Sequence, residues 1–282
     1  MGKIYTFNNK IVTLNNKWCE EYVEPTPVDP NPLGLPPNTI RVKFSSGYTP
    51  DMGSTRTLVD STNNVWDIYA ANVYASNWAS LFSNNANLLE VLGANTTNIT
   101  NMQYLFANCT SLTTITLFDT HNVTTMAGMF NGCSSLTTVP LFDTTNVSNM
   151  NYMLASCQLT TVPLFDTSSV TTMNQMFTSC TNLTTIPLFN TSSVTNMNQM
   201  FKGCSSLTTI PLFNTSSVTN MNQMFYNCTR VETGALALYQ QASTQATPPS
   251  QHSLTFYNCG SNTTSGAAER AQIPSSWGGT GA

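Results

Sequence analysis

The sequence predicts a β-rich solenoid, a parallel stack of 23–24-residue repeats with a cap at its N-terminal and its C-terminal end. Two regularities support this prediction: the dipeptide Leu-Phe recurs in steps of 24, 23, 24 and 24 residues, and six cysteines keep the same period. A fixed period in the twenties means that each unit buries its apolar side against its neighbours, so stacked units share one continuous core. The leucines are Leu117, Leu141, Leu164, Leu188 and Leu212, and the cysteines are Cys109, Cys133, Cys157, Cys180, Cys204 and Cys228.

Each repeat contains two pieces with different apolar spacing. The first runs, in one copy, from Val194 to Leu207, with apolar residues three, three, one, three and three apart, as in helical or 3₁₀ turns with one buried side. The second, Leu-x-x-Ile-x-Leu, predicts a short strand whose Leu207, Ile210 and Leu212 face inward. Stacked strands lie about 4.8 Å apart, so six turns would be roughly 30 Å long.

The repeat also has a family likeness. The pattern Met-x-x-Met-Phe-x-x-Cys-x-x-Leu-Thr-Thr-Val/Ile-Pro-Leu-Phe-Asp-Thr-Ser-x-Val-Thr resembles the BspA-type leucine-rich repeats of bacterial surface proteins and of phages that infect gut bacteria. The resemblance covers residues 95–230. It implies a leucine-rich-repeat-like, curved parallel-β solenoid used for binding or display, without family-wide catalytic residues.

Two segments precede the predicted N-terminal cap. Residues 1–23 form an expected β attachment segment, because alternating apolar residues broken by Asn-Asn predict two short strands. Residues 24–38 are a proline-rich linker, expected to be extended at about 3.1 Å per residue. A small folded segment at residues 1–23, followed by a semi-rigid linker, suggests a role in attachment. The alternative is that this N-terminal region is a disordered leader.

The caps flank the repeats. Residues 39–94 are the expected N-terminal cap, which shields the first repeat and begins with a strand over residues 39–44. Residues 231–282 are the expected C-terminal cap, with helices predicted over Ala235–Gln241 and Gly266–Gln272.

Composition limits the partners. Charged residues make up 8% of the chain, against about 25% in typical globular proteins. Phosphate neutralisation needs clustered Lys or Arg, so we expect no nucleic-acid binding. No run of 18 apolar residues exists, which argues against membrane insertion. The chain start lacks the 7 to 15-residue apolar stretch of a secretory signal, as expected for a virion protein assembled inside its host.

The repeated cysteines admit three readings: disulfides between stacked neighbours, a metal site, or buried thiols. Each cysteine sits in the apolar rhythm between Phe and Leu, where cysteine acts as a small hydrophobe. Zinc needs ligands that converge from short spacings. We therefore predict free, buried thiols and no metal. Cys19 and Cys259 lie outside the register and have no explanation from sequence.

A second repeated position alternates between acid and amide. Stacked aspartates could bind calcium, but the change to asparagine favours a side-chain oxygen that caps the next backbone turn. The residues are Asp119, Asp143, Asp166, Asn190 and Asn214.

The Leu-Phe and Thr-Thr positions decide what the surface offers. If strand alternation continued past the inward leucine, each phenylalanine would face outward as a sugar-stacking platform; the adjacent prolines favour strand termination and a core phenylalanine. The paired threonines predict an outward array of hydroxyls, whose ice-binding interpretation is less favoured than a polar face of a leucine-rich stack. As candidate binding residues we take Thr114, Thr138, Thr161, Thr185 and Thr209.

No catalytic, cofactor-binding or metal site is predicted. The two histidines, His121 and His252, lie in dissimilar contexts, and His121 replaces a Thr or Ser of other repeats. No nucleophile elbow, phosphate loop or pair of catalytic carboxylates occurs.

Together these observations predict a non-enzymatic phage virion protein for host-surface or glycan binding. Residues 1–37 would bind other virion proteins, and the repeats would be displayed as a homo-oligomer or in many copies. The alternative is a BspA-like adhesin or protein-interaction module at the bacterial cell surface.

Overall fold

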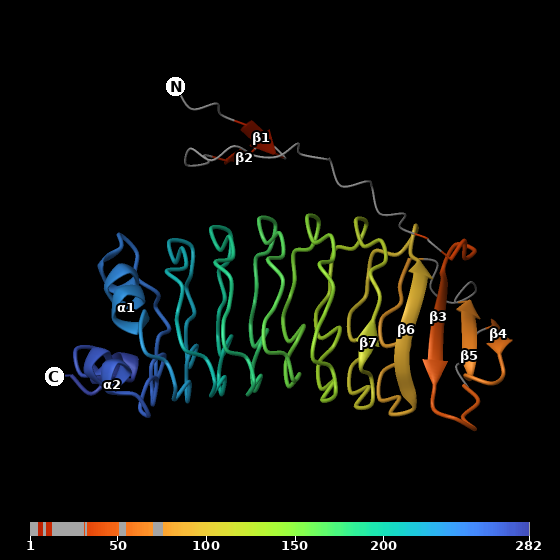
Figure 1. Cartoon of the computed structure of the whole chain (residues 1–282). Coiled ribbons are helices and arrows are strands. Elements are labelled where there is room, and N and C mark those ends of the chain that lie inside the picture. The colour runs from red at the N-terminus through yellow and green to blue at the C-terminus, as the bar shows by residue number, and fades with distance from the viewer. Residues whose placement is uncertain are drawn as a thin grey trace.

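A computed structural model describes residue 31 and residues 33–50, 55–69 and 76–281, together with the backbone of two short strands near the N-terminus. These strands, β1 (Tyr5–Phe7) and β2 (Lys10–Val12), pair antiparallel (Figure 1). They match the two strands predicted within residues 1–23. Cys19 and most of the proline-rich linker, residues 24–38, lie outside the described residues.

The segment predicted as the N-terminal cap contributes four strands to an open, mixed five-stranded sheet in the order β4-β5-β3-β6-β7, and the fifth strand, β7, belongs to the first repeat. All neighbours in the sheet pair antiparallel except β6 and β7, which are parallel. In β3 the alternate residues Ile40, Val42 and Phe44 are buried, which confirms the strand predicted over residues 39–44. The strands are β3 (Thr39–Phe44), β4 (Thr55–Asp60), β5 (Val65–Tyr69), β6 (Leu88–Asn95) and β7 (Thr114–Ile115).

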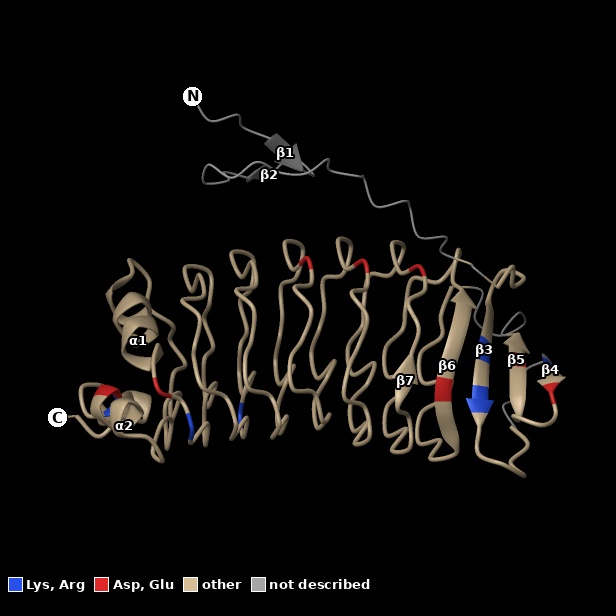
Figure 2. Cartoon of the chain, viewed as in Figure 1, with Lys and Arg blue, Asp and Glu red and all other residues tan. Residues whose placement is uncertain are grey.

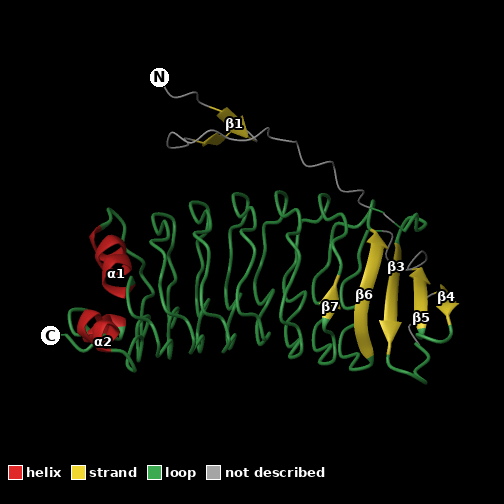
Figure 3. Cartoon of the chain, viewed as in Figure 1, coloured by secondary structure: helices red, strands yellow, loops and turns green. Residues whose placement is uncertain are grey.

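Beyond this sheet the repeats lie side by side in a row, and they consist almost entirely of turns and loops (Figures 1 and 3). The broad prediction, a repeat protein with more strands than helices, is confirmed. The strand predicted in every repeat is wrong, since β7 is the one regular strand of the repeats over residues 95–230. In this first copy the Thr116 N–H donates to the Val91 carbonyl at 3.0 Å. The later copies have Pro140, Pro163, Pro187 and Pro211 at this position, and proline has no N–H to donate.

Contacts between neighbouring repeats run mainly through the Met-x-x-Met-Phe pieces. Parallel bridges join one residue of each copy to its equivalent in the next, from Asn77 to Asn101 and onward to Gln251. Alternate backbone N–H groups donate to the following repeat, as when the Tyr104 N–H donates to the Ala127 carbonyl at 2.8 Å. Each repeat therefore satisfies the backbone of its neighbour without a regular strand.

The remaining N–H groups close tight turns inside each repeat. The Leu105 N–H donates to the Met102 carbonyl at 3.2 Å, with Tyr104 at a φ of 54° in the third position of the turn. A turn of this kind needs a left-handed residue there. Gly128 occupies the equivalent place in the next repeat, where a Cβ would come within 2.1 Å of the Tyr104 ring. The Tyr104 ring thus fills the space that a side chain at position 128 would occupy.

The core consists of columns with one residue from each repeat. The rings of Phe82, Phe106 and Phe130 stack with centroids 5.5–5.6 Å apart. The ring of Phe201 lies 5.3 Å from those of Phe177 and Phe225. Stacked pairs add about 0.5–1.5 kcal/mol each to the benefit of burial.

The repeat register extends on both sides of residues 95–230. Trp78 and Phe82 occupy core positions of a copy that precedes the first predicted one, with the Phe82 N–H donating to the Leu105 carbonyl at 2.9 Å. Near the C-terminus, Phe256 stacks on Phe225 at 5.9 Å. Cys259, three residues later, is buried at the place of the repeated cysteines.

The C-terminal cap contains α1 (Ala235–Thr244), α2 (Thr264–Arg270) and a 3₁₀ turn, η1 (Ser275–Trp277). Both predicted helices are present, with ends shifted by a few residues. The N-cap of α2 is Thr263, whose hydroxyl accepts the Gly266 N–H. None of the helices in the described residues has the length and apolar character needed to cross a bilayer.

Candidate binding surface

The candidate threonines form a regular row on the surface of the repeats, which we call the threonine row. All five are exposed. The preceding threonine of a pair uses its hydroxyl within the fold: Thr184 donates to the Thr160 carbonyl at 3.1 Å, and Thr208 to the Thr184 carbonyl at 3.2 Å. In the described residues no hydrogen-bond partner is recorded for the hydroxyls of the last four members of the row, and Thr114 contacts only the Thr113 hydroxyl, at 3.5 Å. These hydroxyls are free to bind a partner. The row comprises Thr114, Thr138, Thr161, Thr185 and Thr209.

A second row, the leucine row, corrects the sequence prediction. The leucine of each Leu-Phe pair was expected inside, yet these leucines are 39–61% exposed, whereas the phenylalanines beside them are at most 2% exposed. A three-residue turn explains the inversion: the Phe189 N–H donates to the Pro187 carbonyl at 3.0 Å around Leu188. This turn ends strand alternation, so leucine points outward and phenylalanine inward. The row comprises Leu117, Leu141, Leu164, Leu188 and Leu212.

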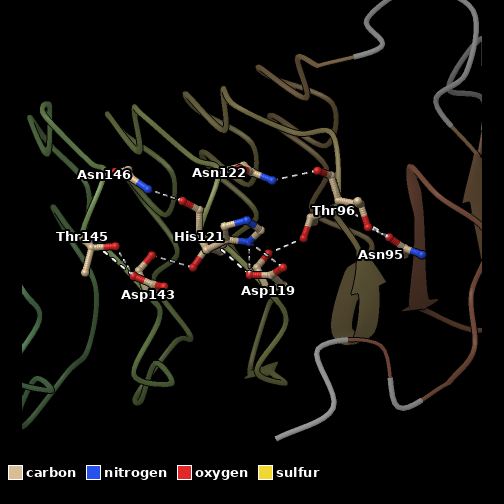
Figure 4. Close-up of polar contacts among 10 residues, drawn as sticks. Asn95, Thr96, Asp119, His121, Asn122, Asp143, Thr145 and Asn146 are labelled. Carbon is tan, nitrogen blue, oxygen red and sulfur yellow. Dashed lines mark hydrogen bonds and ion pairs between the residues drawn. The ribbon is translucent and has the colours of Figure 1, made fainter. Parts of the chain in front are cut away.

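The acid and amide positions cap turns along one edge, as predicted. The Asp119 carboxylate accepts the His121 N–H at 2.9 Å, and the Asp143 carboxylate accepts the Thr145 N–H at 3.0 Å (Figure 4). Asn190 and its equivalents accept the N–H two residues ahead in the same way. The shared oxygen acceptor makes acid and amide interchangeable here.

His121 lies at this edge, where its ring contacts the Asp119 carboxylate at 2.8 Å (Figure 4). The histidine side chain is 54% exposed and the aspartate side chain 23%. The Asn122 and Asn146 amides bridge to carbonyls of the preceding repeat, those of Thr97 and His121. These contacts hold neighbouring turns together. Within the described residues no cluster of three or more His, Cys, Asp or Glu side chains could hold a metal.

Buried threonines form a row that the sequence analysis missed. The Thr167 hydroxyl donates to the Asn190 carbonyl of the next repeat at 2.8 Å, and Thr120 does the same to the Asp143 carbonyl at 2.7 Å. Thr167 is 1% exposed. In the sequence a threonine follows the Asp or Asn in every copy, whereas the residue after that threonine varies. This repetition could have identified the row.

The repeated cysteines are free and buried, as predicted. Each thiol donates to a carbonyl of the preceding repeat, as when Cys133 donates to Phe106 at 3.1 Å. Burial raises the pKa of the Cys109 and Cys180 thiols to about 12, so they are protonated and unreactive at neutral pH. Cys259 is buried as well, which gives this outlier a place in the core.

Charge is confined to the edges of the repeats. In Figure 2 the acidic residues of the repeats lie along one edge and the basic residues along the opposite one. The charged residues over 95–230 are Asp119, Asp143, Asp166, Lys202 and Arg230. No charged residue occurs in the Leu-Thr-Thr to Leu-Phe segments that hold the threonine and leucine rows. The surface between the edges is therefore neutral, with hydroxyl and leucine side chains in parallel rows.

Comparison with known proteins finds a family but no characterised relative. A family profile described as "Mycoplasma protein of unknown function, DUF285" matches residues 76–164 and 155–258, which cover the repeats and also α1. Its first matched residue precedes Asn77, where the parallel bridges begin. No curated protein and no solved structure matches. Since the two matches together span well over half of the chain, this protein belongs to the family of Mycoplasma proteins of unknown function, DUF285.

Proposed function

We propose that this chain is a non-enzymatic binding module, a leucine-rich-repeat-like solenoid displayed on a phage virion for binding to host-surface glycans or proteins. The threonine row is the observation that supports it. It places exposed hydroxyls at one register of successive repeats, on a neutral surface, and four of the five have no hydrogen-bond partner among the described residues. Neutral donors and acceptors at regular spacing suit hydrogen bonding to sugar hydroxyls.

The strength of such binding is set by the number of displayed copies. A neutral hydrogen bond contributes about 0.5–1.5 kcal/mol net, so five threonines would give a few kcal/mol. Association costs an estimated 4–15 kcal/mol in lost freedom of motion. A single copy would bind weakly, and tight attachment requires many linked copies that act together.

We assign the mount to residues 1–37, which would bind other virion proteins. The support is the proline-rich composition of residues 24–38, which suits a semi-rigid spacer. The small β1–β2 pair adds to it, because a lone two-stranded ribbon is marginally stable and gains from docking.

A bacterial surface adhesin or protein-interaction module is the second candidate. The family description refers to Mycoplasma, which favours a bacterial carrier over a phage particle. The repeats would bind in the same way in both settings, and the particle or cell that carries them would differ.

The binding test uses a triple variant, Thr138→Glu, Thr161→Glu and Thr185→Glu, which adds three charges to the threonine row. Its control places the same charges on Ser148, Thr171 and Thr195, which are exposed in the other piece of the same repeats and whose hydroxyls donate to carbonyls of the preceding repeat. Labelled proteins would be applied to a glycan array and to bacterial cells. We expect loss of binding for the threonine-row variant alone; equal binding by both variants would contradict the assignment.

The mount is tested separately, by deletion of residues 1–37. We expect the shortened chain to fold but to be absent from purified particles. Unchanged incorporation would show that the mount lies elsewhere.

A further inference from the structure

The leucine row is an apolar feature on an otherwise polar surface. Its five members are the only exposed large hydrophobic residues between residues 95 and 230, a range that the structure describes throughout. Scattered exposed leucines are ordinary, but neighbouring ones that form a continuous patch mark an interaction site.

The turn geometry does not require leucine at this position. The three-residue turn is closed by backbone groups of Pro187 and Phe189, and the Leu188 side chain points away from the core with 60% exposure. Threonine, serine or asparagine fills every other exposed position of residues 95–230 except His121, Asp143 and Arg230. A polar residue would therefore serve the fold equally well, and leucine needs another explanation.

We propose that the leucine row binds the leucine row of a second copy of this chain, in antiparallel orientation with Leu164 at the two-fold axis. A second copy matches the spacing of the row without adjustment, because both surfaces have the same period. Two-fold pairing of identical patches is also the commonest route to a closed homodimer.

Charge favours this occupant and this orientation. The segments that contain the row are uncharged, so two copies meet without repulsion there. At the adjoining edge the acids occupy the N-terminal half of the repeats and the amides the C-terminal half. Antiparallel pairing about Leu164 brings Asp119 and Asp143 toward Asn214 and Asn190 of the second copy, so that these two acids face amides, while Asp166 lies near its equivalent beside the two-fold axis.

The size of the row determines the strength of the pairing. Five repeats about 4.8 Å apart, with four residues of each in the strip, give a surface of roughly 20 by 13 Å. A standard interface buries about 800 Å² per partner, so pairing through this strip is weak and reversible. It becomes effective where copies are displayed close together. Each threonine of the threonine row precedes the leucine of the same repeat by three residues, so the two rows lie about 10 Å apart.

Cross-linking at single engineered cysteines tests the orientation. The full chain with Cys19→Ser serves as background, because the other seven cysteines are buried. Variants Leu164→Cys, Leu117→Cys and Leu212→Cys are treated with a bis-maleimide too short to span four repeats, about 19 Å. We expect a covalent dimer from Leu164→Cys alone. Leu117→Cys should form one only when mixed with Leu212→Cys. Dimers from Leu117→Cys alone would overturn the antiparallel arrangement, and no dimer from any variant would overturn the pairing.

Sedimentation at high protein concentration supplies a second measurement. We expect concentration-dependent association of the wild-type chain, and its loss in the triple variant Leu141→Glu, Leu164→Glu and Leu188→Glu. The variant with three glutamates at Ser148, Thr171 and Thr195 should associate like the wild type. If association occurs only after residues 1–37 are removed, the N-terminal segment of the same chain covers the row and the proposal fails.

Discussion

Replacing Thr167 with valine removes one hydrogen bond between two repeats while it preserves the shape of the side chain. The Thr167 hydroxyl is buried and donates to the Asn190 carbonyl at 2.8 Å. Valine leaves that carbonyl without this donor and places a methyl group beside it. A buried polar group that loses its partner costs about 1–3 kcal/mol.

The matched control is Thr185→Val in the following repeat. Thr185 is exposed and belongs to the threonine row. Its hydroxyl makes no hydrogen bond with the other described residues. The same chemical change there should alter the free energy of unfolding by less than about 0.5 kcal/mol. The difference between the two variants isolates the buried hydrogen bond from the intrinsic difference between threonine and valine.

Urea titration followed by far-ultraviolet circular dichroism measures both variants against the wild type. We expect a lower midpoint for Thr167→Val and an unchanged midpoint for Thr185→Val, with similar slopes. Equal midpoints for Thr167→Val and the wild type would refute the reasoning. So would an equal loss in both variants, since it would show that burial and pairing of the hydroxyl are irrelevant.

Phe177→Ala should lower the free energy of unfolding by about 3–5 kcal/mol, because it opens a cavity between stacked rings. Leu188→Ala should lower it by less than about 0.5 kcal/mol. Urea titration measures both, and a larger loss of stability in the Leu188→Ala variant would contradict the prediction. Maleimide labelling of the native protein at pH 8 should leave the seven described cysteines unmodified, since the pKa of Cys109 and Cys180 is raised to about 12 by burial; rapid labelling of Cys259 would refute its burial. Asp143→Asn should leave thermal stability nearly unchanged because the amide oxygen makes the same turn, while Asp143→Ala should cost about 1 kcal/mol; equal melting temperatures for these two variants would count against the capping role.

The sequence was sufficient for features that depend on period and polarity. The core position of Cys133 followed from its spacing between Phe130 and Leu136, and the capping role of Asp143 followed from its exchange with asparagine in other repeats. These predictions use only the requirement that equivalent residues of stacked repeats occupy equivalent environments.

The orientation of the Leu-Phe pair could not be obtained in the same way. Both residues are apolar, so hydrophobicity does not distinguish inside from outside. The backbone hydrogen bond from Phe189 to Pro187 makes the distinction, because it ends the alternation of a strand. Proline signals that the strand stops without specifying which turn follows.

The extent of the repeats was hard to predict for a different reason. Trp78 replaces the first methionine of the repeat and Asn85 replaces its cysteine, so the early copy lacks the signature residues. Phe256 follows Phe225 after 31 residues because α1 is inserted between them. Backbone hydrogen bonding preserves the register where the side-chain pattern is lost.

Successive repeats of the chain stack in register along one axis. Distances between spin labels on the threonine row, in the Cys19→Ser background, test this stacking most directly. With labels at Thr114 and Thr209, four repeats apart, in-register stacking predicts a narrow distribution near roughly 19 Å, and with labels at Thr114 and Thr161 about half of that. Distances that do not grow with the number of intervening repeats, or a broad distribution for either pair, would contradict it.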